Sequence, residues 1–510
     1  MATFLSVAYD LSITQWLLGI LAVSVIFELW SVTVFSAKTP GYQFINNPWL
    51  PRFLTRKHAH EYVEDGYAKF IKAKDQPFKM IWWSRECILL PPKYLQDLKR
   101  ADFKNLSFFK NLADAFSLDY SVGDLYESDI MIDVVRKRLN TQLPALIPLL
   151  NEELDFAIAE EIGHSEEWKS FKGNQLLSRI MHRMTCRILA GEKLCRDKVY
   201  IDTSLKFMNS VVINALLSIM LPLGIFRGII RSFIAYFHRR NLEAAVKIVQ
   251  PVVEKRLQER NKQQAHVDAI EWTIDLAGSD PIELEPRRIT LNILQNIWAG
   301  SAGPAALVTQ LVYQTLMMPE YLTPLRNEAL QVISTYGWTE KALNQLHLQD
   351  SFIKEVNRLY PLGSVTAART IMNEPFRFHD GLTLPVGSSI AFPIGAIQKD
   401  PEFFTNPLTF NGFRFVDSTS NDDALKDKEG SGSAQTISPT NLVYGYGKHA
   451  CPGRFYGIRK AKLTFSKLLI DYDMKWDCIP AARPLEFPVE GQFAPNLEQA
   501  IFFRKRAKSD

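Results

Sequence analysis

Cysteine is scarce in this chain, and the few cysteines follow no pairing pattern. Five of the 510 residues are cysteines: Cys87, Cys186, Cys195, Cys451 and Cys478. They are odd in number and scattered, so they fit neither a disulfide framework nor a zinc site. Free thiols of this kind suit a reducing compartment.

A strong excess of charge of one sign is also missing. The formal net charge is +4, and we find no basic tract interleaved with aromatic residues, no internal repeat and no phosphate-cradling loop. We therefore expect no nucleic-acid partner. Apolar residues make up 47% of the chain, which is ample for a large core. Length alone would suggest two or three domains.

One long apolar run, Ile13 to Val34, lies near the N-terminus. It exceeds the ~20 residues that cross a bilayer, and its one charge, Glu28, is expected near the membrane surface or neutralised. A cleaved secretory signal is the alternative. No cation precedes the run, however, and the run is longer than the apolar part of a signal peptide. Cations follow the run, which by the positive-inside rule places the remainder in the cytosol.

The segment Tyr444 to Gly457 carries the most specific chemistry. Its glycines allow a tight turn and a close backbone approach to a flat cofactor. Backbone N–H groups and a following helix start can stabilise the thiolate of Cys451. A cysteine in this setting is a plausible axial ligand of haem iron. For an isolated Cys-Pro-Gly, a free cysteine in a surface turn would be the alternative.

The whole segment resembles the haem-binding loop of the cytochrome P450 family, Phe-x-x-Gly-x-His/Arg-x-Cys-x-Gly. Gly447, His449, Cys451 and Gly453 take the pattern positions, while Tyr444 stands where Phe is usual. The resemblance implies that Cys451 is the proximal thiolate ligand of haem b and that His449 pairs with a haem propionate.

Two further motifs occur upstream in the family's order. Glu355 and Arg358 match Glu-x-x-Arg within a segment of helical periodicity, so they share one helix face. Phe410 to Phe415 resembles the family's Phe-x-x-x-Arg segment, and Arg414 would complete a buried Glu–Arg–Arg cluster that fixes the haem loop. Taken alone, the Glu355–Arg358 pair would be a solvated surface ion pair.

The resemblance implies a mainly α fold with small β-sheets, in a single large haem domain behind a transmembrane helix. We expect a short lumenal N-terminus at 1–12, the anchor at 13–34, a hinge at 35–60 and the catalytic domain at 61–510. It also implies an enzyme of the endoplasmic reticulum membrane, with its catalytic domain in the cytosol. A second apolar stretch, 211–225, is interpreted as the substrate entrance or as an ordinary buried helix.

The sequence departs from the family above the haem. There a long helix usually carries Ala/Gly-Gly-x-Asp/Glu-Thr-Thr, whose acid and alcohol relay protons to dioxygen. Ala302 takes the acid position, while Gly303 and Pro304 take the two Thr positions. None of these side chains can donate a proton, and Pro304 should kink or loosen the helix. Gly300 keeps a small residue that leaves room for oxygen.

This departure leaves three functions open. In the first, the chain is a monooxygenase in which waters or substrate hydroxyls deliver the protons. In the second, it rearranges or dehydrates an oxygenated substrate without dioxygen. In the third, it binds haem and a ligand without catalysis. Asn296, one heptad before Gly303, could hold a relay water or be satisfied by a neighbouring helix.

The remaining site residues come from the resemblance. Arg369 and Arg136, with Arg138 as a rival, are expected at the propionates, and Val365 and Thr366 at a lipophilic substrate. Cations near Cys451 favour docking of NADPH-cytochrome P450 reductase on a basic proximal surface, although an ordinary solvated helix face is the alternative. They are Lys448, Arg454, Arg459, Lys460 and Lys462. The function expected is oxidation of a lipophilic small molecule, such as a terpenoid among fungal secondary metabolites.

Overall fold

The structure is a computed structural model, and a defined part of the chain is described. This part comprises residues 26, 41–46, 58–83, 85–102, 104–220, 227–260, 266–416, 432–478, 480 and 482–507. The anchor expected at 13–34 lies outside it, apart from residue 26. Within these ranges no helix combines the length and apolar character needed to cross a bilayer.

Helices make up most of the described chain. The longer ones are α5 (Phe108–Phe116), α8 (Asn140–Glu161), α9 (Gly173–Leu189), α11 (Lys198–Met220), α12 (Arg227–Gln258), α13 (Ala269–Ala277), α14 (Pro286–Met317), α15 (Leu322–Tyr336), α17 (His347–Leu359) and α19 (Arg454–Asp471). The shorter ones are α3 (Ala59–Gly66), α4 (Leu95–Arg100), α6 (Asp119–Val122), α7 (Ile130–Asp133), α10 (Glu192–Cys195), α16 (Glu340–Asn344) and α18 (Ile394–Ile397). Short segments of other helix types lie at η2 (Tyr67–Lys72), η3 (Pro92–Tyr94), η4 (Leu125–Glu127), η5 (Val134–Leu139), η7 (Pro319–Tyr321) and η8 (Gly447–His449).

The strands form small sheets. The largest has the order β1 (Phe78–Trp82), β2 (Arg85–Leu89), β8 (Ser389–Phe392), β5 (Thr366–Ile371), β3 (Leu106–Ser107). A three-stranded sheet joins β4 (Lys169–Lys172), β12 (Ala500–Lys505) and β9 (Tyr472–Lys475). Two hairpins pair β6 (Phe376–Arg377) with β7 (Thr383–Leu384), and β10 (Phe487–Val489) with β11 (Gln492–Ala494).

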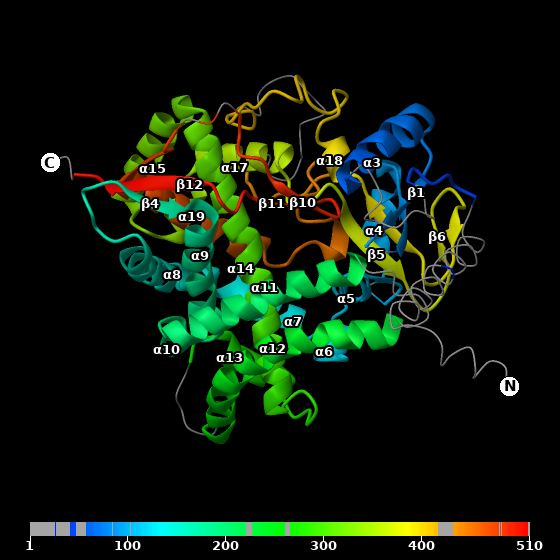
Figure 1. Ribbon diagram of the computed structural model, residues 1–510, viewed down its shortest axis with the longest axis horizontal. Coiled ribbons are helices and arrows are strands. Elements are labelled where there is room, and N and C mark those ends of the chain that lie inside the picture. Colours follow the sequence, from blue (N-terminus) through cyan, green and yellow to red (C-terminus); the bar gives the residue numbers. More distant parts are fainter. Residues whose placement is uncertain are drawn as a thin grey trace, which may run out of the picture.

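Helix α14 is the central element of the molecule. It packs along α9 and also against α12 and α19, and Figure 1 shows it running through the middle of the fold. One apolar core surrounds these helices, and a second covers the five-stranded sheet. The expectation of a mainly α fold with small sheets is confirmed.

Helix α17 carries the Glu-x-x-Arg motif and begins at a half-buried carboxylate. Glu328 of α15 accepts the backbone N–H groups of Leu348 (2.6 Å) and Gln349 (3.1 Å), which otherwise have no partner in a first helical turn. This contact fixes where α17 starts and therefore where Glu355 lies two turns later.

Residues outside the regular elements also pack on the domain. Phe44, inside the expected hinge at 35–60, pairs with Lys79 of β1. In the polar segment before the cysteine loop, Ala434 is buried and its N–H donates to Asp350 at 2.9 Å. Thus at least these parts of the two segments pack on the domain.

Candidate cofactor and active site

The loop that ends at Cys451 is held by its own backbone. The N–H of Cys451 donates to the carbonyl of Tyr444 at 2.7 Å. Gly445 and Gly447 adopt positive φ angles of 76° and 68°, where only glycine is free of strain. A side chain at Gly447 would also meet the Lys99 Cα at 2.8 Å. The turn chemistry therefore requires glycine at 447.

The thiol of Cys451 combines burial with accessibility. Burial raises the pKa of Cys451, while the backbone N–H groups of Gly453 and Arg454 act to lower it. The residue nevertheless keeps an exposed surface, so the thiol is surrounded by protein but opens toward a hollow. A Cβ added at Gly453 would meet no protein atom within 4 Å. These features suit the approach of a flat cofactor to the sulfur.

Positive side chains gather beside this loop. Arg369 is 2% exposed and donates to the carbonyls of Ala368 (2.7 Å) and Tyr446 (3.4 Å). Burial lowers the pKa of Arg369 to about 9. Burial also lowers the pKa of His449 to about 3, with Arg369 and Arg136 adding to the shift. A buried guanidinium bonded to neutral carbonyls is poorly compensated, and the propionates of a haem would supply the missing negative charge.

Arg136 approaches the loop more closely than its rival. Its Nη2 donates to the Lys448 carbonyl at 2.5 Å, and Asn140, one turn later, donates to the Pro452 carbonyl at 2.9 Å. Arg138 instead lies 3.8 Å from Asp275. The start of α8 and the turn before it thus support the cysteine loop, a contact that the sequence did not indicate for Asn140.

The structure brings Glu355, Arg358 and Arg414 together. Glu355 is completely buried, and its oxygens accept Arg358 Nε at 2.8 Å and Nη2 at 2.9 Å. Arg414 Nε lies 3.0 Å from the same carboxylate. The N–H of Asn411 adds a further bond at 2.9 Å.

The two arginines of this cluster also bind backbone carbonyls of the loop that follows α18. Arg358 Nη1 donates to Gln398 (2.7 Å) and Pro407 (2.6 Å), and Arg414 Nη1 donates to Thr405 (2.7 Å). One carboxylate therefore organises an extended loop through two guanidinium groups.

The departure at Tyr444 has a structural counterpart in α17. The amide of Asn357 lies 3.4 Å from the Tyr444 hydroxyl. A phenylalanine could not accept this bond. The hydroxyl thus links the cysteine loop to the helix that carries Glu355.

One face of α14 is lined by very small residues. Ala299 and Ala302 are exposed although α14 runs through the middle of the fold, so this face borders a hollow. A Cβ at Gly303 would meet only Leu362 Cδ1, at 3.8 Å. Leu362 therefore faces Gly303 across this space, at the start of the segment expected to run beside the haem.

The packing of α14 on α9 also requires a small residue at Gly300. A Cβ at this position would lie 3.1 Å from Thr185 Cγ2 of α9. Its lack of a side chain permits the close packing of α14 on α9, and this packing gives a reason for glycine other than room for oxygen.

Pro304 does not end or divide α14, which is helical from Pro286 to Met317. Proline lacks the N–H that would bond to Gly300. Another donor takes its place: Lys460 Nζ lies 2.9 Å from the Gly300 carbonyl, and Thr185 Oγ1 lies nearby at 3.2 Å. The helix therefore continues through Pro304 with the Gly300 carbonyl satisfied, and the kink or loosening expected at Pro304 stays a prediction.

The tentative substrate residues are held by protein contacts. Asn296 donates to the Met131 carbonyl at 3.2 Å, as in the interpretation of a residue satisfied by a neighbouring helix. Thr366 donates to the Leu442 carbonyl at 2.9 Å, and Val365 is buried against the sheet core.

The basic surface expected after Cys451 is partly wrong. Lys460 is 0% exposed and Lys462 4%, and Lys462 pairs with Asp350 at 2.7 Å. Arg459 pairs with Glu340 at 2.6 Å. Of the five cations, Lys448 is exposed and Arg454 half-buried. Charged residues near a cysteine loop look solvent-facing in sequence, but α19 buries two of them.

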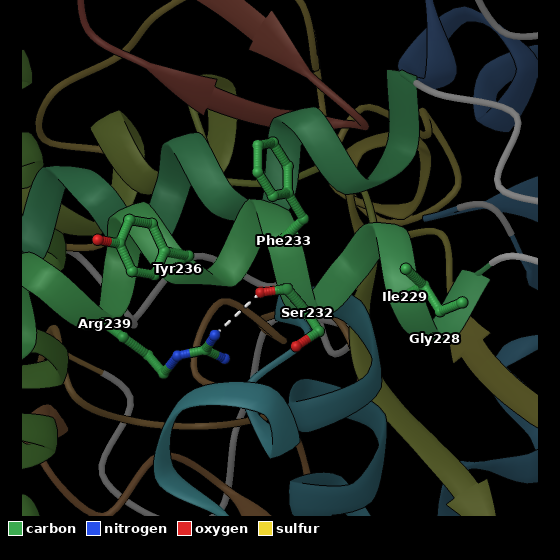
Figure 2. A pocket seen from close by; sticks show the side chains of 6 residues that line it. All are labelled: Gly228, Ile229, Ser232, Phe233, Tyr236 and Arg239. Atoms are coloured by element: carbon green, nitrogen blue, oxygen red, sulfur yellow. Dashed lines mark hydrogen bonds between the residues drawn. The ribbon is translucent and has the colours of Figure 1, made fainter. Parts of the chain in front are cut away.

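An apolar groove lies on α12, next to the stretch interpreted as an entrance. Figure 2 shows the residues that line it, including Ile229, Phe233 and Tyr236. All three are exposed. Arg239 closes one end by donating to the Ser232 carbonyl at 3.0 Å and the Tyr120 carbonyl at 2.7 Å.

Comparison with known proteins decides the family. The model of the cytochrome P450 family matches residues 130–486. The chain belongs to the cytochrome P450 family. It is 39% identical to the cytochrome P450 monooxygenase sirB of Leptosphaeria maculans, over 86% of this chain and 85% of that protein. It is 26% identical to an ent-kaurene oxidase of Fusarium fujikuroi, over 95% of this chain and 91% of that protein.

A solved structure supports the same fold. The retinoic acid-bound cyanobacterial CYP120A1 aligns with this cytochrome P450 at a TM-score of 0.64, covering 90% of this chain and 98% of that one, at 15% identity. The P450 is a haem-thiolate oxidoreductase of the monooxygenase type, with haem iron held by a cysteine thiolate.

Proposed function

We propose that this P450 hydroxylates or otherwise oxidises a lipophilic small molecule, with Cys451 as the axial ligand of haem b. The observation that carries the proposal is the thiol of Cys451, which opens toward a hollow from a loop held by glycine turns beside the buried Arg369. The other described cysteines are less suitable, because Cys87, Cys186 and Cys195 are buried and Cys478 belongs to no such loop.

The residues around the loop would each hold part of the cofactor. Arg369, Arg136 and His449 would bind the propionates. Gly453 would let the backbone lie against the ring, and Gly447 would hold the turn of the loop against Lys99. When bound, haem supplies dioxygen activation, which electron donation from an axial thiolate promotes. The Glu355 cluster would keep the loop in place without touching the cofactor.

The face of α14 with Ala302 and Gly303 would lie over the cofactor. Its small side chains would leave space beside the cofactor but offer no acid or hydroxyl for proton delivery. Because general acid catalysis is typically worth about 100- to 10,000-fold, the protons must come from ordered water or from a substrate hydroxyl. Leu362, which faces Gly303, is a better candidate for substrate contact than Val365 or Thr366. Asn296 would border the site from the preceding turns of α14.

A terpenoid or similar secondary metabolite is the substrate class that we favour. The fungal relatives include proteins named for the oxidation of ent-kaurene. The groove with Ile229, Phe233 and Tyr236 would admit a lipophilic compound. The fold alone does not define the substrate, so the relatives carry this part of the proposal.

Membrane attachment and electron supply complete the proposal. The apolar run at 13–34 would anchor the enzyme in the endoplasmic reticulum membrane, beside its lipids, with residues 61–510 as the catalytic domain in the cytosol. NADPH-cytochrome P450 reductase would dock at the exposed or half-exposed cations around the cysteine loop. These are Lys99, Arg100, Arg136, Lys137 and Lys448.

A second function is favoured by one observation, the absence of a donor at 302 and 303. An isomerase or dehydratase acting on an oxygenated substrate would not need one. A haem-binding protein without catalysis is the further alternative, and the retained Glu355–Arg358–Arg414 cluster argues for a maintained cofactor site.

Isotopic labelling separates these functions. The full chain is expressed in microsomes with reductase and supplied with candidate terpenoids, NADPH and labelled dioxygen. An NADPH-dependent product that carries the label is expected for a monooxygenase. A rearranged or dehydrated product without label, formed without NADPH, would overturn the proposal in favour of the second function. A haem spectrum that responds to ligands without any turnover would favour a binding protein.

A further inference from the structure

Pro304 leaves a gap in the hydrogen bonds of α14. In an α-helix the N–H of residue 304 would donate to the carbonyl of Gly300, but proline has no N–H. The carbonyl lies where α14 packs on α9, and a buried carbonyl without a donor is costly. The chain must therefore supply a donor from elsewhere.

Lys460 of α19 is the principal donor. Its side chain is completely buried, and Nζ lies 2.9 Å from the Gly300 carbonyl and 2.6 Å from Thr185 Oγ1. Thr185 has a single hydroxyl proton, and its oxygen is closer to the Met181 carbonyl (2.8 Å) than to Gly300 (3.2 Å). Thr185 thus accepts a hydrogen bond from Lys460 and donates its own within α9. The hydrogen bond to the Gly300 carbonyl therefore comes from Lys460.

The packing of α19 explains why a lysine can reach this carbonyl. Gly457 lies one turn before Lys460 on the same face of α19, and a Cβ there would be 3.4 Å from the Pro304 ring. Such a contact is an ordinary van der Waals distance, so α19 and α14 pack directly against each other beside the proline. Since α19 begins at Arg454, directly after the cysteine loop, its first turns connect both faces of the proposed haem site.

We propose that Lys460 is a positioning residue that replaces the missing N–H of Pro304 and holds residues 299–304 of α14 in place over the haem. The hydrogen-bond replacement follows from the contacts above, while the location over the haem rests on the proposed function. Burial lowers the pKa of Lys460 to about 7. An amine can donate in either protonation state, so the contact does not depend on the charge.

Two substitutions test the replacement directly. Lys460→Met removes the donor, and Pro304→Ala restores the backbone N–H. In the full-length holoenzyme, we expect K460M to speed amide hydrogen exchange several-fold in peptides covering 298–306. The double variant K460M/P304A should return toward the exchange rate of P304A alone. Equal amide exchange rates in K460M and K460M/P304A would overturn the proposal. If Lys460 merely filled space, restoring the N–H of residue 304 would not reverse the effect of its removal.

Lys462→Met is the matched control. Lys462 lies in the same helix and is also buried, but it donates to the Leu343 carbonyl at 2.8 Å and pairs with Asp350. Adding P304A to K462M should leave the amide exchange rate of K462M unchanged. A return of that rate toward wild type would contradict the specificity of the contact between Lys460 and Gly300. If K460M fails to accumulate, recovery of folded protein in K460M/P304A would support the proposal, and equal failure would overturn it.

A spectroscopic measurement tests the position over the haem. In the ferrous carbon monoxide complex, K460M should shift the infrared stretch of bound carbon monoxide, and P304A should reverse that shift. If P304A restores the amide exchange rate but K460M never shifts the carbon monoxide stretch, the positioning role over the haem is overturned. If wild type shows no thiolate-ligated spectrum, the proposed function fails instead, and the exchange experiment still decides the contact between Lys460 and Gly300.

Discussion

Glu355 and Arg414 are joined across 59 residues of chain, with Arg414 Nε at 3.0 Å from Glu355 Oε2. The carboxylate is fully buried and also serves Arg358. Glu355→Gln would leave two guanidinium groups without their negative partner. Removing one member of a buried ion pair costs about 3–5 kcal/mol, so we expect a loss of this size in unfolding free energy and a sharp fall in haem per polypeptide.

Glu402→Gln provides the control for this substitution. Glu402 pairs with Lys72 at an exposed position, where an ion pair is worth under about 1 kcal/mol. Urea unfolding and haem content of both variants should be compared with wild type. An E355Q variant that matches E402Q in both measurements would contradict the role of the cluster.

Cys451→Ala should abolish thiolate ligation. The sulfur is the group in the loop that can bind iron as a thiolate, and the turn is held by backbone contacts that do not involve the sulfur. We expect the ferrous carbon monoxide spectrum to lose its thiolate signature. Cys478→Ala, at another exposed cysteine, should leave the spectrum unchanged. An unaltered spectrum in C451A would refute the assignment of the ligand.

Alanine at Gly447 and alanine at Gly453 should harm the protein for different reasons. Gly447→Ala places a Cβ 2.8 Å from Lys99 Cα at a positive φ of 68°, so the apoprotein itself should lose stability, by about 1–3 kcal/mol. Gly453→Ala meets no protein atom within 4 Å, so the apoprotein should unfold as wild type does while haem affinity falls. Unfolding of the apoproteins and haem titration separate the two effects. Wild-type haem affinity in G453A would argue against a cofactor over Gly453.

Local patterns predicted the parts of the site that depend on near neighbours. Glu355 and Arg358 share a helix face by spacing alone, and the family motif added Arg414. The burial of Lys460 was not predictable in this way, because its partner Gly300 lies 160 residues away and a lysine after a cysteine loop resembles a surface residue. The roles of Gly300 and Asn140 could not be predicted for the same reason, because both depend on how separate segments pack together.

Acid should destabilise the protein through His182. This side chain is fully buried between Ser301 (3.0 Å) and Ser204 (2.7 Å). Burial lowers its pKa from 6.5 to about 3, and Lys460 adds to the shift. Because the unfolded chain binds a proton that the folded chain does not, the contribution of His182 is present above pH 6.5 and is lost as pH falls from 6.5 toward 3.

His182→Gln tests this pH dependence. Glutamine cannot titrate but can still bond to both serines. Urea unfolding between about pH 5 and 6.5 should show a shallower loss of stability in the variant than in wild type. Parallel pH profiles for H182Q and wild type would contradict the prediction.

Gly303→Thr addresses proton delivery at the face of α14. A Cβ at 303 would have Leu362 Cδ1 at 3.8 Å as its nearest contact, so threonine fits and the variant should fold normally. If water or substrate carries the protons, an added hydroxyl should leave product formed per NADPH unchanged or improved. Gly300→Thr is the control, because its Cβ would press on Thr185 at 3.1 Å and should destabilise the packing of α14 on α9 by about 1–3 kcal/mol. A collapse of product in stably folded G303T, with haem still bound, would show that substrate occupies the space beside Gly303, so that the missing threonine serves substrate shape and not proton relay.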